Sequence, residues 1–253
     1  MISRRVLLSW LGVSAGACAV TAGSPLSAAT GARAAQGTRV INLESFCIAH
    51  GNHESRLDAY LADTLLPRMQ ELHEGPRLCL HAIVAPHIPQ ATVLAAFSSF
   101  DEMLEVRSSL ASSPDVRQAR AELESARILE DVRSQVLVVR EESLHFPTDL
   151  NSFQTGIFEM RSYDAPAWHD GVPTRLLAVL HRARIHPIVN AATAAGEHMP
   201  RFTYVVPFAS LAAREQAWST LEADAEWIDM QRESTATVTG KSIYKLAPYS
   251  RLG

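Results

Sequence analysis

Lysine is nearly absent from this sequence, and the chain carries no excess of positive charge. Of 23 basic residues only Lys241 and Lys245 are lysine, and the formal net charge of the 253-residue chain is −4. Because nucleic-acid-binding domains usually present a basic face, we expect no nucleic-acid partner. With 47% hydrophobic and 20% charged residues, the composition is that of a globular protein with one large domain or two small ones.

Cysteine is scarce as well, and the few cysteines are not spaced as metal ligands. Cys18, Cys47 and Cys79 form no Cys/His pattern of a zinc site, and we predict no metal. Cys47 and Cys79 each lie in a strand-like run, so we expect buried thiols; the alternative is a disulfide in an oxidising compartment. None of the ten histidines has a partner at a spacing that marks a haem ligand, so we predict no cofactor and leave haem open.

Motifs that would name a reaction are missing too. The sequence has no Gly-x-Ser-x-Gly nucleophile, no visible Cys–His arrangement and no glycine-rich phosphate loop. The sequence therefore indicates an architecture more strongly than a chemistry.

No apolar run is long enough to cross a membrane, but residues 1–34 have the pattern of an export signal. The paired Arg4 and Arg5 precede an apolar stretch that ends at Val13, well short of the ~20 residues that a membrane-spanning helix needs. A charged start, a short apolar run and an Ala-x-Ala exit are typical of a secretory signal, and the arginine pair favours the twin-arginine route. We expect a twin-arginine-type signal peptide at 1–34 and a periplasmic or secreted mature protein. Cleavage after Ala29 and lipid anchoring at Cys18 are the alternatives.

A repeat at constant offset organises the rest of the chain. Residues 91–116 align without a gap with residues 202–227, an offset of 111. In each copy a serine, Ser99 or Ser210, follows an apolar run at the place where a helix needs an N-cap. Ser113 and Asp224 then mark the start of a second helix at the same offset. Matching caps at matching places predict a tandem duplication.

Each copy reads as a βαββαβ unit. Alternation predicts half-buried strands and a stripe of leucines predicts a helix that Pro67 kinks. The expected strands are 40–48, 78–85, 92–97 and 135–140 in the first copy and 157–163, 192–197, 202–208 and 242–246 in the second. The fold class is therefore α+β, with two tandem ferredoxin-like units at 38–145 and 153–250. Each four-stranded sheet leaves one face uncovered, so we expect the two sheets to close into a barrel around a cavity.

The second copy resembles the NIPSNAP family. The segments similar to that family are Phe158-Glu159-Met160-Arg161-Ser162-Tyr163, the stretch 202–227 with Ser210-Leu211-Ala212-Ala213-Arg214-Glu215, Trp218 and Asp224-Ala225-Glu226-Trp227, and the ending Leu246-Ala247-Pro248-Tyr249-Ser250. The first copy resembles it less, because Leu43-Glu44-Ser45-Phe46 lacks the arginine and the tyrosine. The resemblance implies the dimeric α+β-barrel fold with each copy as one half-barrel. It implies little chemistry, although that superfamily includes cofactor-free monooxygenases and haem enzymes.

Glu159, Arg161 and Tyr163 are the predicted ligand-binding residues. A strand period of two puts these three on one face and Phe158 and Met160 on the other, and we expect the polar face to line the cavity. A carboxylate, a guanidinium and a phenol there would bind a polar small molecule or position a proton donor. The alternative is that the charged residues pair and hold the structure together. Because the first copy has lost most of this pattern, we expect any site on the side of the second copy.

Our functional prediction is an exported NIPSNAP-like barrel that binds a small molecule in its cavity. One alternative is a cofactor-independent enzyme, monooxygenase- or isomerase-like, that acts on an aromatic or quinone-like substrate. Another is a structural or interaction module whose barrel is filled by side chains. A homo-oligomer would bury the same sheet faces as an intramolecular pair of units, so the sequence leaves the oligomeric state open.

Overall fold

The computed structural model describes residues 38–140, 145, 153–164, 171–197, 199–234 and 236–250. The predicted signal at 1–34 and its alternatives at Ala29 and Cys18 lie outside the described residues, so export stays a prediction. Within the described ranges, no helix is both long and apolar enough to cross a membrane.

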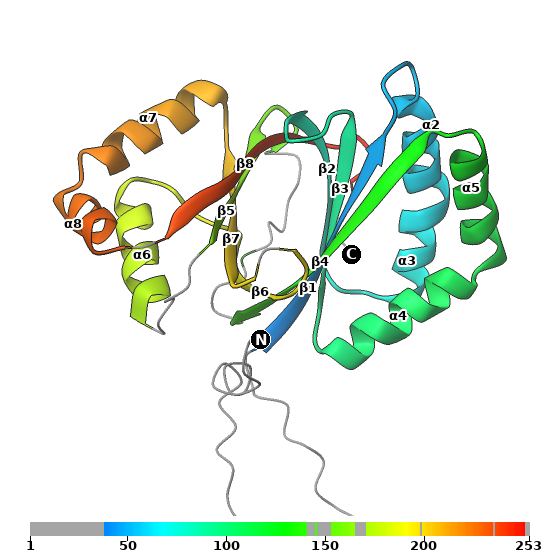
Figure 1. Cartoon of the computed structure of the whole chain (residues 1–253), viewed down its shortest axis with the longest axis horizontal. Helices are drawn as coiled ribbons and strands as arrows, with labels where there is room; N and C mark the ends of the chain where they lie inside the picture. Colours follow the sequence, from blue (N-terminus) through cyan, green and yellow to red (C-terminus); the bar gives the residue numbers. More distant parts are fainter. Residues whose placement is uncertain are drawn as a thin grey trace, which may run out of the picture. The chain divides into compact units, whose positions relative to one another are not determined.

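The first unit follows the expected order of elements, with its helices gathered beside one part of the sheet (Figure 1). Its elements are β1 (Thr38–Ile48), α2 (Glu54–Ala59), the π-helical turn η1 (Tyr60–Leu65), α3 (Leu66–Leu72), β2 (Arg77–Val84), β3 (Gln90–Phe97), α4 (Phe100–Ser112), α5 (Pro114–Ser125) and β4 (Leu129–Arg140). The four predicted strands are present, and β4 begins six residues earlier than the predicted start at 135.

The second unit has the same order, again with its helices beside its own strands (Figure 1). Its elements are β5 (Ile157–Asp164), α6 (Gly171–Arg182), β6 (Val189–Ala195), β7 (Arg201–Phe208), α7 (Leu211–Glu222), α8 (Ala225–Glu233) and β8 (Thr237–Leu246). The predicted α+β class with two βαββαβ units is confirmed. Descent of the two units from a duplication stays a prediction.

The eight strands form a closed barrel in the order β1-β3-β2-β8-β5-β7-β6-β4. Every pair is antiparallel, and the two units meet where β2 pairs with β8 and where β4 pairs with β6. Each unit thus has the strand order 4-1-3-2 of a ferredoxin-like sheet, and hydrogen bonds join the edges of one sheet to those of the other. Closure leaves neither sheet with an unpaired edge strand.

The inside of the barrel contains an apolar core. Strand alternation points every second side chain inward, and many of these side chains pack into one buried cluster. Its members include Ile41, Leu43, Leu78, Leu80, Leu94, Leu137, Phe158, Ile188, Val205, Tyr244 and Leu246. Buried polar side chains share this face of the strands: Gln90 donates to Thr92 at 2.9 Å and to the hydroxyl of Tyr244 at 3.3 Å. The space between the sheets, where we predicted a cavity, is therefore occupied by side chains in the part of the chain that the structure describes.

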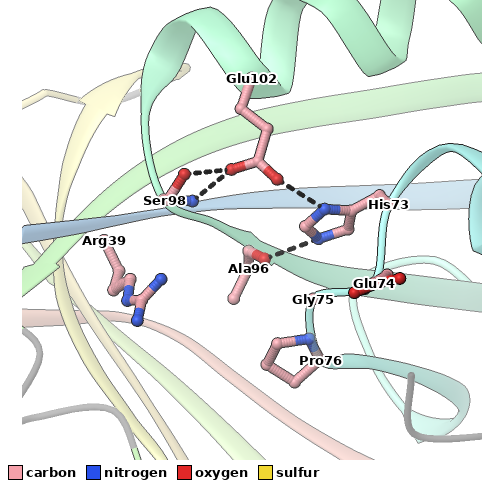
Figure 2. A pocket seen from close by; sticks show the side chains of 8 residues that line it. All are labelled: Arg39, His73, Glu74, Gly75, Pro76, Ala96, Ser98 and Glu102. Atoms are coloured by element: carbon pink, nitrogen blue, oxygen red, sulfur yellow. Dashed lines mark hydrogen bonds and ion pairs between the residues drawn. The ribbon is translucent and has the colours of Figure 1, made fainter.

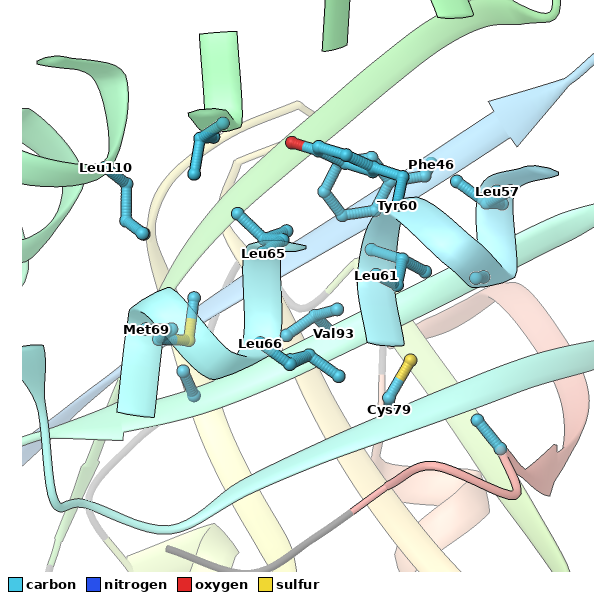
Figure 3. Packing of buried hydrophobic residues seen from close by; sticks show 14 of the residues in the cluster. Phe46, Leu57, Tyr60, Leu61, Leu65, Leu66, Met69, Cys79, Val93 and Leu110 are labelled. Atoms are coloured by element: carbon cyan, nitrogen blue, oxygen red, sulfur yellow. The ribbon is translucent and has the colours of Figure 1, made fainter. Parts of the chain in front are cut away.

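A second core lies between the first sheet and helices α2–α5 (Figure 3). The leucine stripe of the sequence supplies its helical side: Leu57, Leu61 and Leu65 are buried against strand residues such as Phe46 and Val93. A third core lies between the second sheet and helices α6–α8. Both faces of each sheet are therefore buried, one against helices and the other inside the barrel.

Pro67 acts on its helix through a widened turn. The π-helical turn Tyr60–Leu65 stands directly before α3, and Pro67 occupies the second position of α3. Proline has no N–H to donate and its ring crowds the carbonyl four residues earlier. A wider turn at that place relieves the crowding and keeps the stripe of Leu57, Leu61 and Leu65 on one side.

Most of the predicted caps are present. The side chains of Ser99, Ser210 and Asp224 accept hydrogen bonds from the backbone N–H of Glu102, Ala213 and Trp227, each at 3.1 Å. Ser113 precedes Pro114 at the start of α5, but its side chain makes no cap hydrogen bond. Its place is the predicted one, while the capping interaction itself is missing.

Candidate functional site

The predicted trio Glu159, Arg161 and Tyr163 faces the helices and not the barrel interior. Phe158 belongs to the interior apolar cluster and Met160 packs against it, which reverses the predicted faces of β5. The physical reason is that the inward face of β5 meets the apolar cluster, whereas α7 supplies partners for the charges on the other face. A ligand-binding role for the trio stays a prediction.

Glu159 is the centre of a charged cluster between β5 and α7. Its carboxylate has no exposed surface and accepts hydrogen bonds from Arg161 Nε at 2.7 Å and from Trp218 Nε1 at 2.6 Å. Arg214 donates to both carboxylate oxygens, at 3.0 and 2.9 Å. Burial opposes ionisation, but the two guanidiniums and the indole outweigh it and hold the pKa of Glu159 below its ordinary value.

Aromatic rings complete this cluster. The guanidinium of Arg161 lies 3.3 Å from the centroid of the Trp218 ring, a cation–π contact. Tyr163 and Tyr204 are stacked, and their hydroxyls are 2.8 Å apart. Burial raises the pKa of Tyr204 well above its ordinary value. The residues that carry the family resemblance in β5 and α7 thus meet in one place, where they join the sheet to its covering helix.

The first unit has a reduced version of this junction. Arg107 on α4 donates from Nη1 to Asn42 Oδ1 at 2.9 Å and lies 3.0 Å from Glu44 Oε1. The strand registers and the offset of 111 give the equivalent positions in the two units. Residues Asn42, Glu44, Phe46 and Arg107 of the first unit correspond, in that order, to Glu159, Arg161, Tyr163 and Trp218 of the second. The sign of the charge is thus reversed at the Glu44 position, and a guanidinium replaces the indole.

The C-terminal residues of the second unit are bound to the first unit. Past β8, the N–H of Ala247 donates to the carbonyl of Cys79 and the N–H of Cys79 donates to Ser250 Oγ, both at 2.9 Å. The hydroxyl of Tyr249 donates to Asp58 at 2.7 Å, and His81 Nε2 lies 2.9 Å from that hydroxyl. The family-like ending therefore fastens β2 and α2 to the chain that follows β8.

A cleft that offers space for a ligand lies at one mouth of the barrel (Figure 2). Its volume is about 420 Å³, and its walls come from Arg39 at the start of β1, Ala96 and Ser98 at the end of β3, residues 73–76 before β2, and Glu102 in the first turn of α4. Because β1, β3 and β2 are neighbours in the sheet, these three strand ends meet at one place.

His73 and Glu102 form one wall of the cleft (Figure 2). The buried imidazole lies 2.9 Å from Glu102 Oε1 through Nδ1 and 2.8 Å from the carbonyl oxygen of Ala96 through Nε2. Glu102 Oε2 accepts from the N–H of Ser98 at 2.7 Å and also from its hydroxyl. Burial opposes ionisation of Glu102, yet the hydrogen bonds from Ser98 and the nearby His73 hold its pKa below the ordinary value. Both ring nitrogens of His73 thus have partners, and these contacts hold the ring in the wall.

The turn between α3 and β2 needs glycine at position 75. A Cβ on Gly75 would lie 2.2 Å from His73 Nε2 and 2.5 Å from the carbonyl oxygen of Ala96. Behind the turn, the buried Arg77 donates from Nη1 to the carbonyls of His73 at 3.1 Å and Gly75 at 3.3 Å. A guanidinium on carbonyls at the end of a helix is favourable, so Arg77 holds the turn in place.

The signal for this cleft in the sequence was partial. Ser99 and Glu102 have the S-x-x-E spacing of a capping box, and Ser99 was identified as a cap. Arg39, His73 and Gly75 carried no signal, because nothing in their spacing shows that three separate segments converge. We expected any site on the side of the second unit, whereas this cleft belongs to the first.

The described residues offer no cluster of three or more His, Cys, Asp or Glu side chains of the kind that holds a metal ion.

Fold and strand order define the class of this protein as a dimeric α+β barrel. A mutant of the chlorite dismutase from Candidatus Nitrospira defluvii has a similar structure, with 9% identity, a TM-score of 0.53 and coverage of 85% of this chain and 93% of that chain. A haem-binding protein from Thermus thermophilus covers 84% of this chain and 92% of its own at 12% identity and a TM-score of 0.46.

Residues 154–251, about two fifths of the chain, match the NIPSNAP family model. A NIPSNAP domain protein from Burkholderia xenovorans is 19% identical, with a TM-score of 0.34 and coverage of 44% of this chain and 99% of that chain. The search among curated proteins gave no match.

Proposed function

We propose that this protein binds a small polar molecule in the cleft at the mouth of its barrel. The observation that carries the proposal is the cleft itself, about 420 Å³ in volume with a guanidinium, carboxylates and a serine on its walls. Small-molecule sites commonly have volumes of about 300–1,000 Å³ and a few convergent polar groups, and the mouths of β-barrels are a frequent place for them. The packed interior is the reason that we place the ligand at the mouth and not between the sheets.

Thermal unfolding in the presence of small polar molecules tests this proposal. A ligand at about 100 times its Kd stabilises a protein by about 2.7 kcal/mol, which corresponds to a rise in Tm of about 6 °C for a chain of this size. We expect that rise for the wild type and for Arg117→Gln, a variant on the exposed side of α5. Arg39→Gln, which removes a wall of the cleft, should lose it. Failure of every compound to raise Tm, or equal shifts in Arg39→Gln, would contradict the proposal.

A second candidate is a structural or interaction module without a ligand. It is favoured by one observation, the interior core that packs the two sheets together. Thermal unfolding distinguishes the two candidates, since a structural module would show no rise in Tm with any compound.

We also propose that the protein acts outside the cytoplasm. The support is the Arg4-Arg5 pair ahead of a short apolar stretch. Replacement of both arginines by lysine should keep the full-length chain in the cytoplasmic fraction of a bacterial host, while the wild type moves to the periplasm or the medium. Equal distribution of the two forms would contradict export by this route.

A further inference from the structure

We propose that His181 and His186 form a binding site for a late transition-metal ion at the end of helix α6. The site shares no residue with the cleft of the first unit and does not depend on the proposed function. It comes from two exposed imidazoles that a helix-ending turn brings together, and from the distance between their rings.

A Schellman turn ends α6 and explains why the two histidines meet. Five residues along an unbroken helix would place them on different faces. Arg184 instead takes a left-handed conformation, with φ of 59°, and donates its N–H to the carbonyl of His181 at 3.0 Å. The N–H of Ile185 donates to the carbonyl of Leu180 at 2.9 Å. These two bonds define the motif, and the chain turns back beside the last turn of the helix.

Apolar packing beneath the turn holds it in place. Leu180 and Ile185 have no exposed surface and belong to the core between the second sheet and its helices. An apolar contact between these two positions commonly accompanies a Schellman motif. His181 and His186 are both exposed. The buried pair therefore anchors the turn, while the two imidazoles stay open to solvent.

The distance between the two rings suits two ligands of one ion. Their centroids are 5.0 Å apart, and the ring planes are inclined by 35°. A metal ion lies about 2.1 Å from a ligating imidazole nitrogen, and so roughly 3.2 Å from the ring centre. Two such rings at a ligand angle between about 90° and 109° have centres about 4.5 to 5.2 Å apart. The observed distance lies within that range.

The surroundings of the pair favour a cation. Apart from their contact with each other, neither ring has a hydrogen bond or an ion pair among the described residues. The adjacent charge of Arg182 is balanced by Asp224 and Glu226 at the start of α8, at 3.1 and 2.8 Å. The C-terminal end of a helix also carries a partial negative charge.

A third histidine lies close to this turn. The N–H of His145 donates to the carbonyl of Ile188 at 2.9 Å, two residues after His186, and its side chain is exposed. The described side chains do not form a set of three arranged around one ion. We therefore assign the pair as the protein ligands and the other positions of the ion to water.

The chemistry of the ligands selects the ion. Imidazole suits Cu²⁺, Ni²⁺ and Zn²⁺, and the affinity of a given site is highest for Cu²⁺. Mg²⁺ and Ca²⁺ prefer oxygen ligands. The expected occupant is thus a divalent copper, nickel or zinc ion, with copper bound most tightly.

Calorimetric titration of the full-length wild type with these ions tests the site. We expect one Cu²⁺ per chain, weaker binding of Ni²⁺ and Zn²⁺, and no binding of Mg²⁺. His181→Gln and His186→Gln should each weaken Cu²⁺ binding about tenfold or more, because the second imidazole acts at high effective concentration once the first has bound.

The matched controls are His50→Gln and His53→Gln, which remove two histidines three residues apart ahead of α2. Both should keep the wild-type affinity for Cu²⁺, as should Arg39→Gln, which alters the cleft. Electron paramagnetic resonance of the Cu²⁺ complex should show nitrogen couplings from two imidazoles in the wild type and from one in each single variant at α6. Circular dichroism spectra confirm that each variant is folded.

Several outcomes would overturn the site. Cu²⁺ binding that survives the double variant His181→Gln/His186→Gln would show an adventitious ion only. Couplings from a single imidazole in the wild type, or equal weakening in the controls, would place the ion elsewhere. Mg²⁺ binding as tight as that of Cu²⁺ would contradict an imidazole site. None of these results changes the thermal screen of the cleft, so failure here leaves the proposed function standing.

Discussion

At the scale of single residues, Glu159 carries a charge effect that can be measured directly. Glu159→Gln leaves Arg161 and Arg214 without their carboxylate in a buried place, and removal of one partner of a buried pair costs about 3 kcal/mol. We therefore expect the free energy of unfolding in urea to fall by about that amount at pH 7. Glu215→Gln, an exposed neighbour on α7, should change it by less than about 0.5 kcal/mol.

The same residue predicts a dependence on pH. The folded-state pKa of Glu159 lies below its ordinary value of 4.5, so its stabilisation is fully present above 4.5 and is lost as the pH falls through the folded-state pKa. The difference between wild type and Glu159→Gln should accordingly shrink in acid. Urea unfolding at pH 7 and near pH 3 measures this difference in the free energy of unfolding. A difference of the same size at both pH values would show that the carboxylate is not held ionised by its partners.

The thiols of Cys47 and Cys79 are the second residue-scale case. Both are free and buried, and burial raises both pKa values, that of Cys79 to about 12. Only about one Cys79 thiol in ten thousand is then ionised at pH 8, and the thiolate is the reactive form. We expect iodoacetamide to leave both residues unlabelled in the native protein and to label both in urea, as read peptide by peptide by mass spectrometry. Rapid native labelling of Cys79 would contradict this.

At the scale of elements, the starts of α7 and α5 make a matched pair. Ser210 accepts a hydrogen bond from the N–H of Ala213, whereas Ser113 makes no such bond. Loss of a working N-cap costs about 1 kcal/mol, so Ser210→Ala should lower the free energy of unfolding by about that amount. Ser113→Ala should lower it clearly less. Equal losses would indicate that the serine at α7 stabilises through something other than its cap.

The turn between α3 and β2 gives a sharper test of the cleft. In Gly75→Ala the new Cβ would overlap the Ala96 carbonyl oxygen, a backbone atom that cannot move aside. We expect a loss of about 2 kcal/mol in stability together with weaker ligand binding, since the His73 wall must shift. Gly240→Ala is the control, because its Cβ meets Ser162 at an ordinary 3.6 Å. Equal behaviour of the two variants would mean that the turn tolerates a side chain.

At the scale of the whole molecule, Tyr249 links the end of the second unit to the first. Burial raises the pKa of Tyr249, and the nearby Cys79 and Asp58 add to the shift, so the phenol stays protonated and donates. Tyr249→Phe removes a hydrogen bond to a carboxylate, a loss of about 2 kcal/mol. Hydrogen exchange at the amides of Cys79 and Ala247 should become faster. Tyr163→Phe, which breaks a hydroxyl pair within the second unit, should leave these amides unchanged.

Elements were predictable from local chemistry, and the faces of the strands were not. The leucine stripe of α2 and α3 and the serines at 99 and 210 are short-range signals, and they placed helices and caps well. For β5 the alternation separated Glu159 from Phe158 but could not tell which side is inward, because both sides are buried. The cleft depends on Arg39, His73 and Glu102, which come together only through the order of strands in the barrel.

A barrel made of two identical chains presents every feature twice, related by a two-fold axis. Here one chain supplies both halves, so a substitution alters one half alone. At the offset of 111, the positions that correspond to Ser98 and Glu102 are occupied by Ala209 and Ala213. The second half therefore lacks the polar side chains of this cleft. The charged cluster at Glu159 is likewise complete only in the second half, because Asn42 and Glu44 stand at the corresponding places of the first. The two halves of this barrel therefore differ in sequence, and a titration should saturate at one ligand per barrel, where a symmetric barrel of two identical chains would bind two.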